Sequence, residues 1–291
     1  MNQHDAHYLT LITSPASLSR KELAGLLHSE AGMDARTIEM RLGRTPPCIL
    51  GLYDPRQCLA ATRTILNQGG DAFSCSMDDI SSLGPTHKIR DFELKQDGIH
   101  VTLWRAGVEI INPDDLHILI RAKLSEQKTT SPSTAIDAPH WIVSGNRRHT
   151  GISSAQLGAG FGLGGAYGLA LSVYRMQGMS DYANEKTMKT SDKLDLHLKD
   201  GRVFQIDGDK FGFGILGEQR GLSDNENIDK MCELLAHLAP EAIVDPYFSL
   251  WKPPARHQQL RLPGMKINNE EPAFAFYSRW AALMYRHVSG S

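Results

Sequence analysis

The residues best suited to chemistry form a glycine-rich run in the middle of the chain. Gly160, Gly162 and Gly165 have the G-x-G-x-x-G spacing that lets a loop backbone approach the phosphates of a nucleotide. That mechanism needs a strand directly before the glycines and an acidic residue about twenty positions after them. The nearest strand pattern, at residues 141–143, lies too far upstream. We therefore predict no cofactor and keep the three glycines as the candidate positions for a phosphate-bearing ligand.

Acidic residues and a histidine form a second candidate group. Asp195, His197 and Asp207 occupy positions in two neighbouring strand patterns, where one sheet face could bring them together for general acid–base work. Asp207 and Asp209 also resemble the start of a calcium loop, but Lys210 follows where further oxygen ligands belong. The chain has no nucleophile elbow, no H-E-x-x-H and no Walker loop. We predict neither a catalytic residue nor a metal site.

The spacing of the cysteines favours neither a zinc site nor a disulfide framework, because no C-x-x-C pair occurs. The four cysteines are Cys48, Cys58, Cys75 and Cys232. So few thiols in 291 residues are typical of a reduced protein. The first residues also lack the basic start and the long apolar run of a signal peptide. We expect a cytoplasmic protein.

Composition narrows the class of partner. Apolar residues make up 41% of the chain and charged residues 22%, which suits a folded globular protein with a sizeable core. The net charge of −2 provides no overall field that would gather nucleic acid or an anionic membrane. We therefore expect protein partners, no nucleic acid and no membrane, and the composition leaves the oligomeric state open.

Helix and strand signals alternate through residues 1–85. An apolar strand pattern precedes a helix that Ser19 and Glu22 open as a capping box. Asp34 and Asp54 stand where caps of a second and a third helix belong. The full order is strand, helix, helix, strand, helix, strand, which predicts a small α/β sandwich.

This N-terminal part resembles the C-terminal domain of the bacterial ribosomal stalk protein. The resemblance covers roughly residues 8–77 and rests on the element order, on residues 42–47 and on the helix that leaves Asp54 and ends at a glycine pair. It implies a small protein-binding module; a generic ferredoxin-like sandwich is the alternative. The basic residues in place of that family's lysine-rich factor-binding helix are Arg20, Lys21, Arg36, Arg41 and Arg44.

From residue 86 the hydrophobic period changes from that of helices to that of strands. Asp97-Gly98 is a hairpin signal, and apolar residues alternate with polar ones over residues 99–104. The same alternation returns over residues 194–206, and a helical stripe follows at residues 223–238. We predict a run of antiparallel strands closed by one helix.

That second part looks like the pleckstrin-homology-like barrel, over about residues 89–248. The resemblance implies binding of phosphoinositides or peptides, although the first hairpin offers a lipid head group only Lys95. Any other α+β sandwich is the alternative. The predicted fold is therefore α+β: a small α/β sandwich, then an antiparallel barrel or sandwich closed by a C-terminal helix. The predicted domains are residues 1–85, residues 86–250 with a glycine-rich insertion at 125–193, and a tail at 251–291.

Three interpretations compete for the uncharged residues 151–174 within the insertion. A nucleotide-binding loop is the first. A membrane span is the second, because the segment is long enough, although glycine supplies little transfer energy. A soluble hairpin is the third, since apolar residues alternate with glycines and would leave one bare face. We predict the hairpin.

The C-terminal tail carries one amphipathic helix pattern, which Pro272 can open. Its apolar face consists of Phe274, Tyr277, Trp280, Ala281, Met284 and Val288. The other side carries Ser278, Arg279, Ala282 and Arg286. An aromatic face of this size left in water would promote association. We predict that the helix docks on its own chain with Trp280 buried.

These patterns together predict a non-enzymatic adaptor or regulatory protein that acts through protein-binding surfaces. The sequence names no partner. The alternative is an enzyme or ligand-binding protein that uses the glycine-rich segment at residues 158–168 for a phosphate-bearing ligand.

Overall fold

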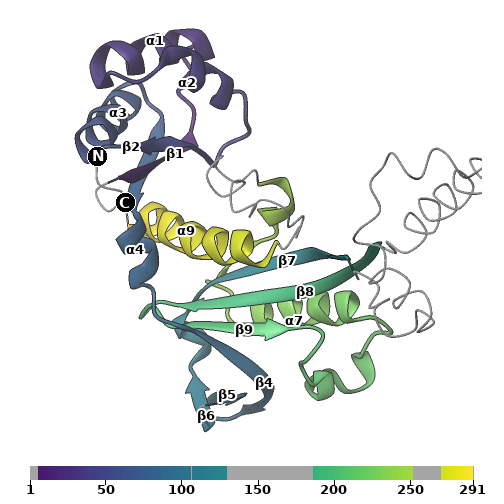
Figure 1. Ribbon diagram of the computed structural model, residues 1–291. Helices are drawn as coiled ribbons and strands as arrows, with labels where there is room; N and C mark the ends of the chain where they lie inside the picture. The colour runs from purple at the N-terminus through teal and green to yellow at the C-terminus, as the bar shows by residue number, and fades with distance from the viewer. Residues whose placement is uncertain (1–5, 106, 130–185, 252–269, 291) are drawn as a thin grey trace, which may run out of the picture. The chain divides into compact units, whose positions relative to one another are not determined.

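The computed structural model describes residues 6–105, 107–129, 186–251 and 270–290 (Figure 1). One compact unit consists of Met1–Ser125 and Thr190–Ser291, and a second consists of Glu126–Lys189. The described part has two sheets and several helices, so the predicted mixed α and β fold class is confirmed. The division of the chain at residue 85 stays a prediction.

The N-terminal part follows the predicted element order. Its elements are β1 (His7–Thr13), α1 (Arg20–Ala31), α2 (Ala35–Arg41), β2 (Cys48–Tyr53), α3 (Pro55–Asn67), β3 (Asp71–Ser76) and α4 (Met77–Ser82). The three strands pair antiparallel in the order β2-β1-β3. Ser19 and Glu22 form the predicted capping box, and Asp54 caps α3. Helix α4, which Ser76 caps, is absent from the predicted order.

The second sheet has seven strands in the order β10-β7-β8-β9-β4-β5-β6. The strands are β4 (Thr86–Lys95), β5 (Gly98–Leu103), β6 (Gly107–Ile111), β7 (Leu116–Thr129), β8 (Lys186–Leu198), β9 (Val203–Asp207) and β10 (Ile243–Asp245). The helical elements are η2 (Pro113–Asp115), η3 (Phe213–Gln219), α7 (Asp224–Leu238), η4 (Tyr247–Leu250) and α9 (Glu271–Gly290).

The predicted antiparallel barrel is wrong in two respects. Strand β4 pairs parallel with β9, and β10 pairs parallel with β7, so the sheet is mixed. Neither sheet closes into a barrel. The reason is topological, because β7 pairs with β8 and β10 instead of continuing the meander from β6. The sheet therefore ends in two edges, β6 and β10.

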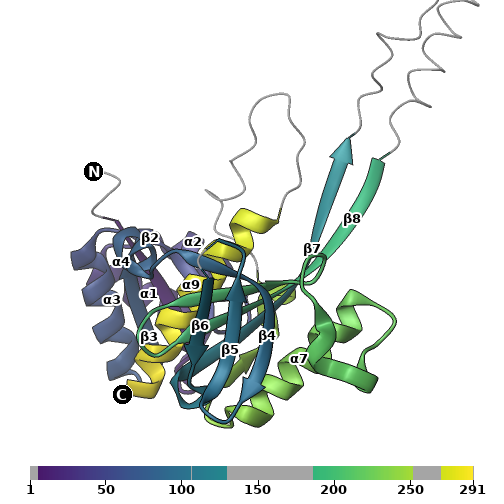
Figure 2. The ribbon, with the colours of Figure 1, turned by 90° about the horizontal axis from the view of Figure 1, so that it is seen from below.

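The seven-stranded sheet has a helix on each face (Figure 2). Along β8, Leu194 and Leu196 point into a core shared with α7 residues such as Met231. The intervening Asp195 and His197 point the other way and bond to α9. The period of two in the β8 sequence therefore separates an apolar face from a polar one.

Strand β1 is also buried on both faces. Leu9 and Leu11 belong to the core formed with α1, α2 and α3. Tyr8 lies edge-on against Phe276 of α9, with ring centroids 5.1 Å apart. Thr10 Oγ1 accepts a hydrogen bond of 2.9 Å from Trp280 Nε1.

Helix α9 docks on its own chain, as predicted, and Trp280 is only 1% exposed. The sequence predicted one apolar side, but Ser278 and Ala282 on the other side are also buried. The difference arises because α9 contacts β1 with one side and β8 with another, so a small polar residue can be interior. Val288, which belongs to the predicted apolar face, is 43% exposed near the helix end.

Replacing Trp280 by Ala should lower the free energy of unfolding by about 3–5 kcal/mol, because it removes a buried indole and leaves Thr10 without its donor. Chemical denaturation measures this loss. Val288→Ala on the same helix is the matched control and should change stability little. An unchanged midpoint for both Trp280→Ala and a chain truncated before Glu271 would show that α9 is not part of the core.

Candidate functional site

Four buried polar side chains from β8, β9 and α9 form one connected network. Ser278 Oγ lies 2.6 Å from Asp195 Oδ2 and 2.7 Å from His197 Nε2. Gln205 Nε2 donates to Asp195 Oδ1 at 2.8 Å. Strand alternation predicted that Asp195 and His197 share a face, and they do. Strand alternation could not predict the contribution of Ser278. The feature of the sequence that could have indicated it is a small hydroxyl residue within an aromatic-rich helix.

Burial sets the charges in this network. It raises the pKa of Asp195 to about 6, although the hydrogen bonds from Ser278 and Gln205 oppose the rise. It lowers the pKa of His197 to about 3, and Arg286 adds to the lowering. At neutral pH the network therefore contains a carboxylate and an uncharged imidazole.

The hydrogen bonds have a consistent direction at neutral pH. His197 Nδ1 has no hydrogen-bond partner among the described residues, which favours a tautomer with its proton on Nε2. His197 Nε2 then donates to Ser278 Oγ, and the Ser278 hydroxyl donates to Asp195. Ser278 Oγ therefore forms one hydrogen bond with the acid, Asp195, and one with the base, His197.

Asp207, the third member of the predicted acid–base set, has a different role. Its carboxylate Oδ2 accepts a 2.7 Å hydrogen bond from the buried Lys193 and lies 3.4 Å from Lys210 Nζ. Burial alone would raise the pKa of Asp207, but Lys193 and Lys210 lower it overall. The lysines occupy the carboxylate that the calcium interpretation needed, and the described residues contain no metal-binding cluster.

The network is closed to substrates. Ser278 is 1% exposed, His197 is fully buried, and α9, which carries Ser278, packs against His197. A nucleophile must reach a reacting carbon, and this hydroxyl is surrounded by its own partners. The observed geometry supports a structural role, in which the hydrogen bonds of Ser278 with Asp195 and His197 hold α9 against β8 in one register.

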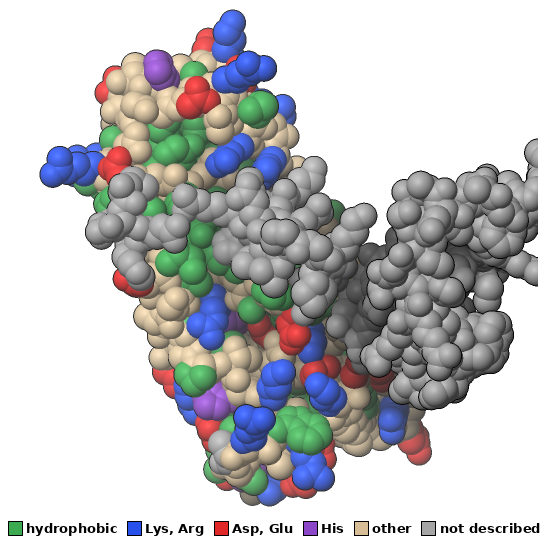
Figure 3. Space-filling view, in the orientation of Figure 1, with side chains coloured by type: hydrophobic (Ala, Val, Ile, Leu, Met, Phe, Trp, Pro, Cys, Tyr) green, Lys and Arg blue, Asp and Glu red, His purple; other side chains and the backbone are tan. Residues whose placement is uncertain are grey.

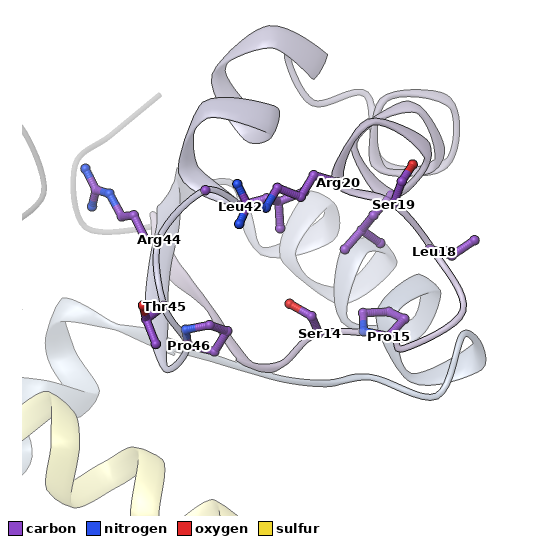
Figure 4. A pocket seen from close by; sticks show the side chains of 11 residues that line it. Ser14, Pro15, Leu18, Ser19, Arg20, Leu42, Arg44, Thr45 and Pro46 are labelled. Carbon is purple, nitrogen blue, oxygen red and sulfur yellow. The ribbon is translucent and has the colours of Figure 1, made fainter.

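A cavity of about 390 Å³ lies in the N-terminal part, between the start of α1 and the loop after α2 (Figure 4). Arg20 extends across the cavity toward Leu42 (Figure 4). Its guanidinium also lies close to the backbone of Gly43, since a Cβ atom built on that glycine would be 3.6 Å from Arg20 Nη1. Ser14 and Ser19 contribute hydroxyls to the lining. Ser19 is already engaged in capping α1, and the lining contains no base that could activate a hydroxyl.

The other sequence candidates provide no accessible site within the described residues. Gly160, Gly162, Gly165 and the hairpin predicted for residues 151–174 lie outside the described residues. All four cysteines are buried and free, and burial raises the pKa of each thiol, so none is an activated nucleophile.

An apolar surface is exposed on the outer face of β5 and β6. Trp104, Val108 and Ile110 are 49%, 62% and 49% exposed. The register pairs Thr102 with Val108 and His100 with Ile110, so these side chains share the face opposite to the core. Strand β6 pairs only with β5 within the described part of the chain, and its other edge meets no described strand. This surface is an accessible apolar feature of the sheet, and its exposed side chains are larger in number than those at the other edge, where Val244 of β10 is 41% exposed.

Asp195 and His197 should respond to acid with opposite signs. Protonation of Asp195 in the folded state stabilises the fold as the pH falls from about 6 toward 3.8, its pKa when unfolded. His197 protonates near 6.5 when unfolded but near 3 when folded, so it destabilises the fold over the same interval. The two contributions should nearly cancel in the native chain.

Asp195→Asn removes the compensating group. Relative to the native chain, this variant should lose about 2 kcal/mol more stability between about pH 6 and pH 4.5. His197→Gln should shift the dependence in the other direction. Urea unfolding at several pH values tests both. Parallel pH profiles for the native chain and the two variants would contradict the assignment of charges.

Comparison with family models, curated proteins and solved structures finds no match to any of them. Among the described residues, no helix combines the length and the apolar character needed to cross a bilayer. The site must therefore be interpreted from its own geometry.

Proposed function

We propose that the protein is a non-enzymatic adaptor or regulatory protein, and that it binds a protein partner through the outer face of β5 and β6. The observation that carries this proposal is the exposed apolar set of Trp104, Val108 and Ile110 beside a sheet edge that pairs with no described strand. Large apolar side chains gathered on one exposed face favour association. An edge strand adds backbone donors and acceptors that a partner strand can satisfy.

The buried network supports the non-enzymatic part of the proposal. Asp195, Ser278 and His197 are residue types used in hydrolysis, but their order and burial suit the anchoring of α9. The acidic and cysteine candidates are likewise buried or paired.

The two family resemblances enter as part of the proposal. The element order from β1 to β3 is compatible with a stalk-protein-like binding module. The meander of β4, β5 and β6 with a later helix supports a distant relation to pleckstrin-homology-like domains, in an open rather than a closed form. Both families would supply binding surfaces, not catalysts.

We also propose a cytoplasmic protein that binds neither nucleic acid nor a membrane. Four free, buried thiols support a reducing compartment. The net charge of −2 supports a partner recognised by local contacts rather than by a general field.

A photo-cross-linking residue placed at Val108 in the native host should give a discrete protein adduct, because that side chain is 62% exposed at the proposed surface. The matched control is the same residue at Met40, which is 66% exposed on α2. Gel electrophoresis and mass spectrometry identify the adducts. Absence of an adduct from position 108, or the same adducts from both positions, argues against this surface.

The alternative function, binding of a phosphate-bearing ligand at residues 158–168, predicts a different result in a thermal-shift screen. Under the proposed adaptor function, nucleotides and divalent metals should leave the melting temperature of the full chain unchanged. A saturable rise that disappears when Gly160, Gly162 and Gly165 are replaced together by Ala would favour the ligand-binding alternative.

A further inference from the structure

Three cationic residues lie near Trp104 on the proposed binding surface, and one of them contacts its ring. The guanidinium of Arg90 lies 5.8 Å from the centre of the Trp104 ring, in a cation–π contact. The Trp104 backbone N–H donates to Lys88 O at 3.1 Å, so Lys88 on β4 lies beside Trp104, the residue that follows β5. Arg105 follows Trp104 directly. We call Lys88, Arg90, Trp104 and Arg105 the basic cluster.

The charges of the basic cluster are not fully compensated within the described part of the chain. Lys88, Arg90 and Arg105 are exposed, and none of them forms an ion pair with a described carboxylate. Among the nearby acids, Glu109 binds Arg202 at 3.0 Å and Glu93 binds Lys95 at 3.3 Å. Asp91, next to Arg90, is exposed on the same face and accepts a hydrogen bond from its neighbour's backbone N–H, so it offsets part of the positive charge without forming an ion pair. Figure 3 shows Lys and Arg side chains gathered with hydrophobic ones where Figure 1 places β4, β5 and β6.

The basic cluster adjoins the N-terminal end of β6. Gly107 begins the strand just after Arg105, and Val108 and Ile110 continue the same outer face. A strand added beside β6 would place alternate side chains next to Val108 and Ile110, since directly opposed Cβ atoms lie about 4.5–5.5 Å apart. Beyond Gly107 the added chain would pass Arg105 in the turn between β5 and β6, and it would cross the end of β5 to reach Lys88 and Arg90 on β4.

We propose that the partner segment is an extended acidic peptide that adds as a strand to β6. Its alternate apolar side chains pack on Val108 and Ile110, and its acidic residues bind Lys88, Arg90 and Arg105. This inference rests on the proposed function and specifies the chemistry of the partner. Backbone pairing distinguishes such a peptide from a lipid surface or a nucleic acid, which also attract cations but form no β ladder.

Charge complementarity is the reason for proposing an acidic peptide as the partner. A basic or neutral peptide would leave three exposed cations without partners near the aromatic ring. A second copy of this chain would bring a second set of the same cations to the interface, and like charges placed together disfavour association. An acidic segment satisfies the edge, the apolar side chains and the charges together.

The probe is a short synthetic peptide in which Val alternates with Glu, followed by a run of Glu, and its binding to the full chain is measured by fluorescence anisotropy. Two control peptides replace every Glu by Lys, or methylate the backbone nitrogen of alternate residues. The acidic peptide should bind at least about tenfold more tightly than either control, because one lacks charge complementarity and the other cannot form the ladder. Its affinity should fall as salt rises from about 50 mM to about 500 mM.

Charge reversal locates the site. Arg90→Glu combined with Arg105→Glu should weaken the acidic peptide by about tenfold or more and strengthen the Lys peptide. Arg63→Glu, at an exposed position on α3, is the control and should leave both affinities unchanged. All these substitutions are at exposed positions, so equal melting temperatures verify that the variants fold.

Three results would overturn the inference. The first is equal affinity for the acidic and Lys peptides, and the second is equal affinity for the acidic peptide with and without N-methylation. The third is an unchanged affinity for the acidic peptide after charge reversal. Tighter binding of single-stranded oligonucleotides or phosphatidylserine vesicles, abolished by the same reversal, would assign the cluster to that ligand instead. A protein adduct from position 108 without an acidic preference leaves the proposed function standing and rejects only this inference. Absence of the adduct as well rejects both.

Discussion

The structure depends on one helix that is buried on two sides. Trp280 of α9 donates to Thr10 in the three-stranded sheet, and Ser278, two residues away, donates to Asp195 in the seven-stranded sheet. Apolar burial supplies most of the stabilisation, at roughly 25 cal/mol per Å². Burial also makes an unsatisfied polar group costly, by about as much as several buried methylenes contribute. The two hydrogen bonds give Trp280 Nε1 and Ser278 Oγ partners, and they fix which turn of α9 faces which sheet.

Local signals explain how much of the fold the sequence predicts. Helix starts are determined by caps that span at most four residues, such as Ser19 with Glu22 and Asp54 before Pro55. The order of elements from β1 to β3 is therefore predicted correctly. The sheet order is not, because the parallel pairing of Thr86 with Val203 joins residues more than a hundred positions apart. No local pattern distinguishes a meander that closes into a barrel from one whose last strand ends as an edge.

The same difference between local and long-range information applies to the candidate site. Alternation along β8 places Asp195 and His197 on one face, and this follows from the period of a strand. Ser278 is 83 positions from Asp195, and nothing in its neighbourhood marks it as interior rather than exposed. Without Ser278 the pair resembles an acid and a base available for catalysis. With it, both are hydrogen-bonded inside the protein, and the same residue types serve to anchor a helix.

Helix α9 also determines where the sheet is left uncovered. The core that it forms draws sheet residues from β7 and β9, such as Ile118, Ile120 and Val203, and includes none from β5 or β6. The inner face of β5 is covered from the other side, because Ile99 and Val101 share a core with Phe213 and α7. The outer face of β5 and β6 therefore has no described helix over it, and the exposed residues there include Trp104 and Val108. Among the described residues, the acid and base of the candidate site are interior, whereas these large apolar side chains are exposed. The proposal of a surface that another chain completes rests on this distribution.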